Sequence, residues 1–573
     1  MNDIRRTILW VIFGFSMVLL WDQWQVANGN KATFFPSTPT PVATTKAPPA
    51  SDVPGASTVP SAATSGVLPA GSGAVPASAV PTAPSAVPRE RFTVATDLLR
   101  ITFDAEGGSL VRAEFLKVTA DSVADKNKQP ENFVLMEDSP ERIYVAQTGL
   151  IGGDFPNHKT VMTASGDREL KEGANELVVR FESPEKSGIK LVKTYTLRRG
   201  SYAIGVKHEV TNTGTAPVTP QVYMQLTRGA GSSGGSFITN PTGTFTGPGV
   251  YTPEQKYQKI EFTAVDKNKV EIQKESTSGW VAMVQHYFVG AWILPDGVKR
   301  ENFVRKVDAL YSVGMIAPLA PVAPGATQAV QAEFFGGPQQ EKMLEQVAPG
   351  LDLVKDYGIF TILAKPLYWL LDKLHGFIGN WGWSIMALVL TIKIAFYWLQ
   401  AKGYESMAKM KAINPKIMAM RERLKDNPQQ MQQEMMKIYR EEKVNPMGGC
   451  LPIMVQIPVF IALYWVLLSS VEMRNAPWIG WIRDLSTPDP YFILPVVMTL
   501  TTLLQTALNP TPPDPMQAKL MWFMPLAFSV MFFFFPAGLV LYWITNNVLS
   551  IAQQWIINTR MGVPPEFNLP KFR

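Results

Sequence analysis

Apolar residues in this chain come in long blocks rather than being spread evenly. The first block follows Arg5 and Arg6 and continues to Trp21, and a spanning helix needs about 20 such residues. Two arginines before an apolar run are typical of a signal sequence. Because no small-x-small cleavage site follows closely, and because Trp21 and Trp24 suit a membrane interface, we expect residues 1–26 to be an uncleaved signal anchor. A cleaved signal peptide is the alternative.

The pattern changes to period two at about residue 90 and keeps it to about 345. The preceding segment, 27–89, consists mostly of Pro, Ala, Ser, Thr, Val and Gly, and this composition predicts an extended tether without a core. Runs such as Leu177–Phe181 and Ile189–Leu197 then alternate apolar and polar positions, and turn signals such as Glu106–Gly108 separate them. Many short strands with Gly-rich turns predict one all-β sandwich domain over 90–345.

A helical pattern occupies the rest of the chain. Residues 350–379 predict an amphipathic helix, which would lie on the outer leaflet or belong to the β domain. Five further apolar stretches predict the membrane spans of a helical core over 380–557. These stretches are Trp381–Gln400, Met447–Val471, Tyr491–Leu508, Ala518–Phe535 and Ala537–Ile557. Together with the N-terminal anchor they predict a polytopic α-helical membrane protein with six transmembrane helices and a large extracytoplasmic β domain.

Charge predicts the orientation of the spans. Residues 401–446 contain ten Lys/Arg and six Asp/Glu, whereas the basic residues of 472–490 are only Arg474 and Arg483. An excess of Lys and Arg marks cytoplasmic segments. We therefore expect both termini to be cytoplasmic, including the short tail 558–573, and the β domain to be periplasmic.

The cytoplasmic segment 402–446 predicts a helical hairpin. Asn414-Pro415 and Asp426-Asn427-Pro428 interrupt an otherwise helical pattern there. Its methionines suit either a flexible binding surface or simple packing between the two helices. The candidate substrate-contact residues of this hairpin are Met407, Met410, Met420, Met435 and Met436.

Enzymatic chemistry has little support in the sequence. The four histidines have no metal-ligand spacing with other histidines, with Cys or with acidic residues, and no phosphate-loop, nucleophile-elbow or dinucleotide motif is present. His208 lies on a predicted strand, and we expect it to face solvent. Cys450 is the only cysteine, which excludes a disulfide-rich module. We therefore expect neither an enzyme nor a metal or cofactor site.

Lys393 is the most informative residue. It lies deep in an apolar span, where a charge that faces lipid costs at least a few kcal/mol. We expect the side chain to face a water-filled or protein-lined cavity, with snorkelling to the cytoplasmic headgroups as the alternative. Polar residues of other spans would line the same cavity or act only as hydrogen bonds between helices. These candidates are Gln456, Thr502, Gln505, Asn546 and Asn547.

Several short segments between 350 and 560 resemble, in the same order, the YidC family of membrane protein insertases. The segments are Ser406–Met410, Pro415–Ile417, Ala419–Arg423, Asn445–Cys450, Gln456–Phe460, Asp514–Met516 and Phe535–Trp543. The N-terminal anchor and the β domain resemble the Gram-negative bacterial form in architecture.

This resemblance implies a five-helix insertase core with a hydrophilic groove that opens to the cytoplasm and to lipid. The family usually has an arginine where this chain has Lys393, a polar residue where it has Val389, and often a tyrosine where it has Trp543. The matching motifs add Pro458 and Trp543 to the candidate groove residues. The implied function is the insertion and folding of inner-membrane proteins, alone or with the Sec translocon. The implied partners are nascent membrane proteins, the ribosome and the lipid bilayer, but not DNA, and no cofactor is implied.

Two other functions are compatible with a membrane core that carries an outer domain. A solute transporter or channel with an extracytoplasmic binding domain is the first, although the spans contain no deep acidic residue and no visible inverted repeat. A sugar-processing β domain is the second, and it rests on analogy at the level of the fold alone.

Overall fold

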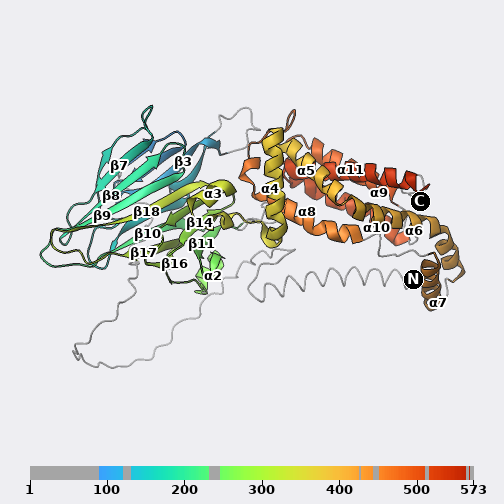
Figure 1. Cartoon of the computed structure of the whole chain (residues 1–573), viewed down its shortest axis with the longest axis horizontal. Helices are drawn as coiled ribbons and strands as arrows, with labels where there is room; N and C mark the ends of the chain where they lie inside the picture. The colour runs from blue at the N-terminus through green and yellow to red at the C-terminus, as the bar shows by residue number, and fades with distance from the viewer. Residues whose placement is uncertain are drawn as a thin grey trace, which may run out of the picture.

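The computed structural model of the chain describes residues 90–120, 131–230, 245–424, 427–442, 451–509, 515–562 and 567. In this part of the chain a β domain and a helical region follow each other along the long axis (Figure 1). The predicted anchor 1–26, the predicted linker 27–89 and the motif Asn445–Cys450 lie outside the described residues.

Two antiparallel sheets form the β domain, and each has nine strands within the described residues. The first sheet has the order β1-β2-β3-β4-β5-β10-β17-β16-β13 and the second β12-β11-β14-β15-β18-β9-β8-β7-β6. The strands of the first sheet are β1 (Arg91–Ala95), β2 (Leu99–Asp104), β3 (Ser109–Thr119), β4 (Asn132–Asp138), β5 (Ile143–Ile151), β10 (Gln221–Gly229), β13 (Glu275–Ser276), β16 (Arg300–Val307) and β17 (Leu310–Pro318). Those of the second are β6 (Thr163–Gly166), β7 (Glu176–Glu182), β8 (Ile189–Arg198), β9 (Ala203–Asn212), β11 (Gly247–Thr252), β12 (Lys256–Lys259), β14 (Trp280–Gln285), β15 (Phe288–Ile293) and β18 (Thr327–Pro338).

Alternating side chains make the core between these sheets. Every second residue of β9 is buried, as the period of two requires when one face of a sheet is covered. Aromatic rings fill much of the space, and the indole Nε1–H of Trp292 in β15 donates to the carbonyl oxygen of Gln225 in the opposite sheet at 3.2 Å. The predicted β sandwich is thus confirmed.

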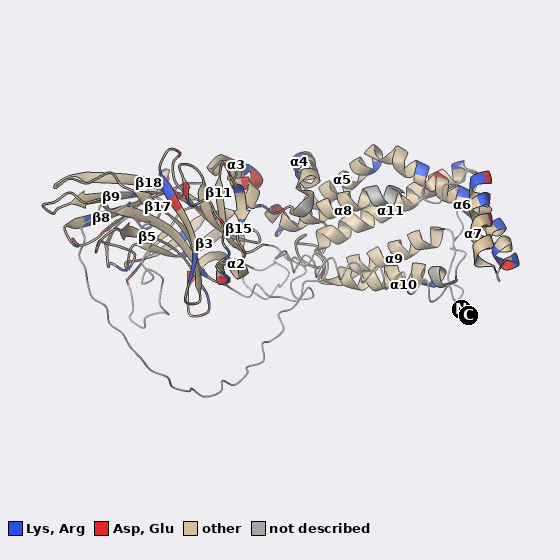
Figure 2. Ribbon diagram, turned by 90° about the horizontal axis from the view of Figure 1, so that it is seen from below, with Lys and Arg blue, Asp and Glu red and all other residues tan. Residues whose placement is uncertain are grey.

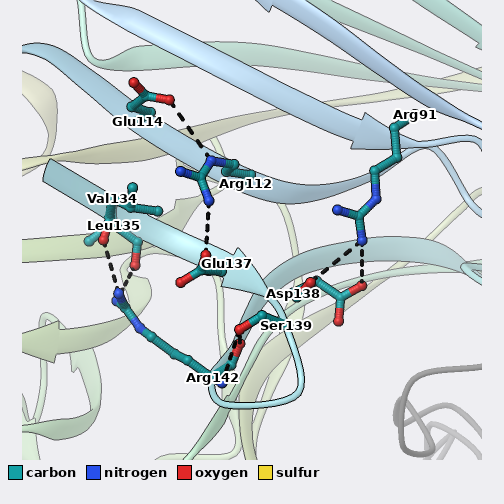
Figure 3. A network of polar contacts seen from close by, with 9 residues as sticks. All are labelled: Arg91, Arg112, Glu114, Val134, Leu135, Glu137, Asp138, Ser139 and Arg142. Carbon is teal, nitrogen blue, oxygen red and sulfur yellow. Dashed lines mark hydrogen bonds and ion pairs between the residues drawn. The ribbon is translucent and has the colours of Figure 1, made fainter. Parts of the chain in front are cut away.

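An ion pair joins β3 and β4 where their ladder is irregular, and a second lies within β3 (Figure 3). The guanidinium of Arg112 contacts the carboxylate of Glu137 at 2.9 Å and that of Glu114 at 3.9 Å. Arg142 follows β4 and donates to the carbonyl oxygens of Val134 and Leu135. Exposed ion pairs contribute roughly 0–1 kcal/mol each, so this network assists register more than stability.

The helical region begins after β18. Its elements are α3 (Glu341–Val347), η2 (Leu351–Val354), η3 (Gly358–Phe360), α4 (Thr361–Ile378), α5 (Trp381–Ala395), α6 (Tyr397–Arg423), α7 (Pro428–Glu441), α8 (Leu451–Ser469), η4 (Val471–Met473), α9 (Ile493–Leu508), α10 (Pro515–Met531), η5 (Phe532–Phe534) and α11 (Ala537–Arg560). A short helix, α2 (Phe262–Asp266), belongs to the β domain. Helix α4 lies across the long axis of the bundle, at the end that faces the β domain (Figure 1).

Most of the bundle helices have fewer than 20 residues and few charges, whereas α6 and α11 are longer. Within the described residues no single helix is long and apolar enough to pass as a membrane span, whereas Trp381–Ala395 and Tyr397–Met410 pass together with a bend of 69° between them. Figure 2 shows α8, α9 and α10 almost without charged residues, whereas blue and red gather on α6 and α7 and on the β domain. The helical region is confirmed, and the number of six spans stays a prediction.

Two breaks differ from the sequence prediction. The predicted span Trp381–Gln400 is divided at Phe396, where α5 ends and α6 begins. Conversely, Asn414-Pro415 does not interrupt the hairpin, since α6 runs through both residues to Arg423. A proline inside a helix costs about 3 kcal/mol. Burial of Ile413, Ile417 and Met420 against α7 offsets this cost.

The β domain is joined to the near end of the bundle through the segment after α8. The guanidinium of Arg474 donates to the carbonyl oxygens of Thr119, at 2.8 Å, and Ala120, and it lies over the rings of Phe133, Tyr287 and Phe288. Nearby, the imidazole Nε2 of His286 lies 3.0 Å from the carbonyl oxygen of Leu468 at the end of α8. These contacts, which we call the seam, connect residues more than a hundred positions apart.

Candidate polar groove

A cavity lies among α5, the start of α6, α8 and α11. Its enclosed volume is only about 20 Å³, room for a water molecule, and it opens into a larger space of about 440 Å³ that includes outside solvent. Its lining mixes polar and apolar side chains. The polar residues are Lys393, Gln400, Gln456, Tyr542 and Asn546, and the apolar ones are Val389, Ile392, Phe396, Leu399 and Val459.

Lys393 is the cationic residue of this lining. It is 7% exposed, and its ammonium donates to the hydroxyl oxygen of Ser550 on α11 at 2.7 Å. The Ser550 hydroxyl in turn donates to the backbone carbonyl of Asn546 at 2.7 Å. The lysine therefore points toward α11 inside the bundle. In this structure it does not snorkel to the surface.

Three side-chain amides and the hydroxyl of Tyr542 form the rest of the polar lining. The Gln456 amide on α8 donates to the Asn546 side-chain oxygen on α11 at 3.0 Å, which closes one wall of the cavity. Gln400 is 8% exposed, and its side-chain oxygen has no hydrogen-bond partner among the described residues. Amides both donate and accept, so this lining suits a polypeptide backbone as well as water.

The remaining candidate residues do not line the cavity. Asn547 faces α9 and donates to the hydroxyls of Thr501 and Thr502 at 3.2 and 2.9 Å, so it joins two helices. Trp543 packs on Phe460, with ring centroids 4.7 Å apart, and on Phe532. Gln505 and Pro458 are half-buried on α9 and α8.

The sequence analysis did not single out two polar lining residues, Gln400 and Tyr542, or Ser550, which bonds Lys393 from beside the cavity. Helical spacing held a signal for two of them. Ser550 follows Asn546 by four positions, and Tyr542 precedes it by four, so all three share one face of α11. Gln400 belongs to α6, beyond the break at Phe396, and the continuous helix expected there gave no reason to single it out.

The methionines of the α6–α7 hairpin divide into two groups. Met420 is 5% exposed, and Met410 and Met435 pack around it in the small core between the two helices. Met407 is half-buried outside that core, and Met436 is 51% exposed. Packing therefore accounts for most of the pattern, and Met436 is the most exposed of the five candidates.

The buried titratable groups of the β domain serve the fold. His208 is 0% exposed, which corrects the expectation of a solvated face, and its Nε2 lies 2.9 Å from the Thr148 hydroxyl. The ammonium of Lys193 in the neighbouring strand donates to the carbonyl oxygens of Gly107 and Thr148 at 2.6 and 2.7 Å. Burial lowers the pKa of Lys193 to about 7 and, with the nearby lysine, that of His208 to about 3. Together the two side chains join the two sheets.

One group of carboxylates has the spacing that a metal ion requires. Side-chain oxygens of Glu341, Glu345 and Asp352 lie within 4.8 Å of one another near α3. The Tyr357 hydroxyl donates to Glu341 at 2.7 Å, and the Lys365 ammonium pairs with Asp352 at 2.8 Å. These partners give the cluster a structural role at the start of the helical region.

Comparison with known proteins covers both domains. The family model described as the YidC periplasmic domain matches residues 91–370, and the model described as 60Kd inner membrane protein matches 373–563. Curated relatives named membrane protein insertase YidC include those of Cupriavidus taiwanensis and Ralstonia nicotianae, each 54% identical over 98% of both chains. A third, from Burkholderia cenocepacia, is 52% identical over 98% of this chain and 99% of its own.

Solved structures resemble the chain only loosely. A crystal structure of an active YidC insertase with its first transmembrane domain resolved is 18% identical, with a TM-score of 0.38 over 81% of this chain and 92% of the other. A galactose mutarotase related enzyme from Lactobacillus acidophilus has a TM-score of 0.29 at 10% identity, over 43% of this chain and 97% of its own. The family models and the full-length relatives are decisive, and the chain belongs to the YidC family of membrane protein insertases.

Proposed function

We propose that this chain inserts client proteins into the inner membrane by receiving them in the polar groove. The observation that carries the proposal is the buried ammonium of Lys393, which lies in a cavity lined by the amides of Gln456 and Asn546. The family is an insertase family and not an enzyme family, in agreement with a sequence that has no catalytic motif. Its inner-membrane location and periplasmic domain follow from the two family models.

The groove lowers the cost of moving polar segments into the bilayer. An unpaired polar group in an apolar medium costs several kcal/mol, and a polar cavity shortens the apolar path that it must cross. The ammonium of Lys393 attracts acidic residues of the entering segment, because charges interact strongly where water is scarce. The apolar segment of the client then leaves sideways along lipid-facing residues such as Phe523 and Phe528 on α10, which are 67% and 56% exposed. No covalent step is involved.

The proposed topology places both termini in the cytoplasm and uses six spans. Charged side chains on α6 and α7 support a cytoplasmic hairpin, at the end of the molecule opposite the β domain (Figure 2). Helix α4 is the proposed interfacial helix. Ile362, Trp369 and Phe377 form its apolar outer stripe and are 89%, 60% and 92% exposed, whereas Tyr368 and Leu371 pack on the bundle.

Partners beyond the client are proposed from the family resemblance and from charge. The hairpin would meet the client first, with Met436 exposed on α7. Lys437 and Arg440 on the same helix are exposed cations of the kind that contact ribosomal RNA electrostatically. The Sec translocon is the other proposed partner. Nascent membrane proteins would thus pass from the ribosome to the hairpin and then to the groove.

Photo-crosslinking to a ribosome-held nascent membrane protein tests the proposal. Probes at Gln456 and Asn546 lie in the cavity, whereas a control probe at Val548, which is 49% exposed on α11, faces away from it. We expect crosslinks at the two groove positions that depend on nascent-chain length, and lipid adducts alone at Val548. Lipid labelling at every position, together with passage of a small solute through the vesicles, would favour the transporter.

A further inference from the structure

The groove cation is held by a specific partner. Lysine has a long flexible side chain, and fixing it costs rotamer entropy that some contact must offset. Here the contact is the 2.7 Å hydrogen bond from the ammonium to Ser550, a residue that is 3% exposed. Because the Ser550 hydroxyl gives its proton to the carbonyl of Asn546, its oxygen accepts from the ammonium, and the Tyr404 side chain is a further hydrogen-bond partner of this serine. The acceptor is therefore oriented before any client arrives.

This contact belongs to a network that crosses three helices. Gln456 on α8 holds the side chain of Asn546 on α11, the Asn546 carbonyl holds the Ser550 hydroxyl, and Ser550 holds Lys393 on α5. Within the described part of the chain no carboxylate forms an ion pair with Lys393. The charge of the ammonium is thus left for an external anion, while its position is set by a neutral acceptor.

Building on the proposed function, we propose that Ser550 is the positioning residue for the groove cation. It holds the Lys393 ammonium inside the cavity, where acidic residues in the translocated segment of a client reach it. Without the hydroxyl, the ammonium would lose its acceptor in a medium of low dielectric constant and would withdraw toward water or headgroups. The serine therefore favours clients that carry Asp or Glu in the segment that crosses the membrane.

The test uses the full-length protein in proteoliposomes and two versions of one client. The client has a single span and a translocated N-terminal tail, which carries either two Asp or two Asn residues. The variants are Ser550→Ala and Ser550→Thr, since threonine keeps the hydroxyl and its bond to the preceding turn. Ser529→Ala is the matched control, because Ser529 is also 3% exposed and donates to the carbonyl of Pro525 at 2.8 Å without touching a lysine.

The readout is the ratio of insertion rates for the Asp and Asn clients. Ser550→Ala should lower this ratio roughly 3- to 10-fold, the effect expected for one net hydrogen bond. Ser550→Thr should restore the ratio, and Ser529→Ala should leave it at the wild-type value. In a Lys393→Ala background, Ser550→Ala should have no further effect on it, since the two residues act as one unit.

Two results would overturn the inference. One is an equal loss of both clients in Ser550→Ala, which would make the serine merely structural. The other is an unchanged ratio in a Ser550→Ala protein that still inserts the Asn client. Failure of the wild-type protein to insert either client would instead refute the proposed function, so the two failures are distinguishable.

Discussion

Lys393 shows what a single charge contributes when its surroundings are apolar. Replacing it with alanine removes the cation and should lower insertion of an acidic client about tenfold, a change of 1.4 kcal/mol in the barrier. Lys393→Arg should retain at least half of the activity, because the guanidinium keeps the charge although its planar fork differs from an ammonium. Cell-free insertion into vesicles that contain equal amounts of each variant measures both effects. Full activity of a well-expressed Lys393→Ala protein would refute a role for the cation.

Lys193 predicts an unusual pH dependence of the β domain. Burial lowers its pKa to about 7 in the folded protein, whereas an exposed lysine titrates near 10.4. Between these values the unfolded chain binds more protons than the folded one, so stability rises with pH from about 7 to 10. We expect urea midpoints of the full-length protein in detergent, read from hydrogen exchange in β8, to increase over this range.

The control for this prediction is Lys193→Met, which has similar volume and no titrating group. The variant should be less stable, because the Gly107 and Thr148 carbonyl oxygens lose their donor. Its urea midpoint should no longer rise between pH 7 and 10. A rise of equal size in the variant would show that other groups cause it.

His158 and His208 predict how the stability of the β domain changes at acidic pH. Burial lowers the pKa of each to about 3, and the charge of Lys193 adds to the effect. The unfolded chain therefore binds more protons below about pH 6.5, and stability should fall from there toward pH 3. His208→Gln, which keeps a polar contact with Thr148 without titrating there, should reduce this loss in the same urea measurement.

The sequence alone could predict the burial of some single residues, but not their hydrogen-bond partners. The apolar run around Lys393 was enough to indicate a cavity, but its partner Ser550 lies 157 positions away and could not be named. Alternation along β8 puts Lys193 on the same side as Leu191 and Tyr195, and the structure shows that this side is buried, although we made no sequence prediction for Lys193. His208 lies on the buried side of β9 in the same way, whereas we predicted from its polarity that it would face solvent. The contacts that make such burial tolerable come from the opposite sheet.

At the scale of elements, the α6–α7 hairpin contains methionines that pack in its core and methionines that are exposed and could bind a client. Met420 is buried in the hairpin core, and truncation to alanine should cost about 2–3 kcal/mol, as for other buried methionines. Met436→Ala should leave stability within about 0.5 kcal/mol, since its side chain is half exposed. Hydrogen exchange of α6 and α7 in the membrane-embedded protein measures this difference. Equal protection in both variants would contradict the assigned hairpin core.

Elements were predicted where their pattern is local and periodic. The alternating strands and the apolar helical stretches were evident, but one predicted interruption is absent and one real interruption was not predicted. Pro415 looked like a helix end, and only the packing of Ile413 and Ile417 on α7 explains why α6 continues. The break at Phe396 has neither glycine nor proline within two residues, which are the usual local causes of a sharp kink. Whether a helix continues or breaks at these positions depends on packing against other helices, which the neighbouring residues in the sequence do not reveal.

At the scale of the whole molecule, the seam connects the β domain to the bundle. Its parts come from β3, from the β14–β15 turn and from the segment after α8, so no local pattern predicts it. Arg474 is central to the seam, because its guanidinium contacts three aromatic rings and two carbonyl oxygens at once. An arginine used this way has no equivalent substitute, since lysine lacks the planar face and the forked donors.

Arg474→Ala should therefore let the two domains move relative to each other. Spin labels at Val178 on β7 and at Ile362 on α4 are exposed positions on the two sides of the seam, once Cys450 has been replaced by alanine. We expect one narrow distance distribution for this background and a broad one for Arg474→Ala. Arg483→Ala, an exposed arginine in the same loop, should keep the narrow distribution. If Arg474→Ala also stays narrow, the remaining contacts, such as that of His286 with Leu468, hold the domains together without the arginine.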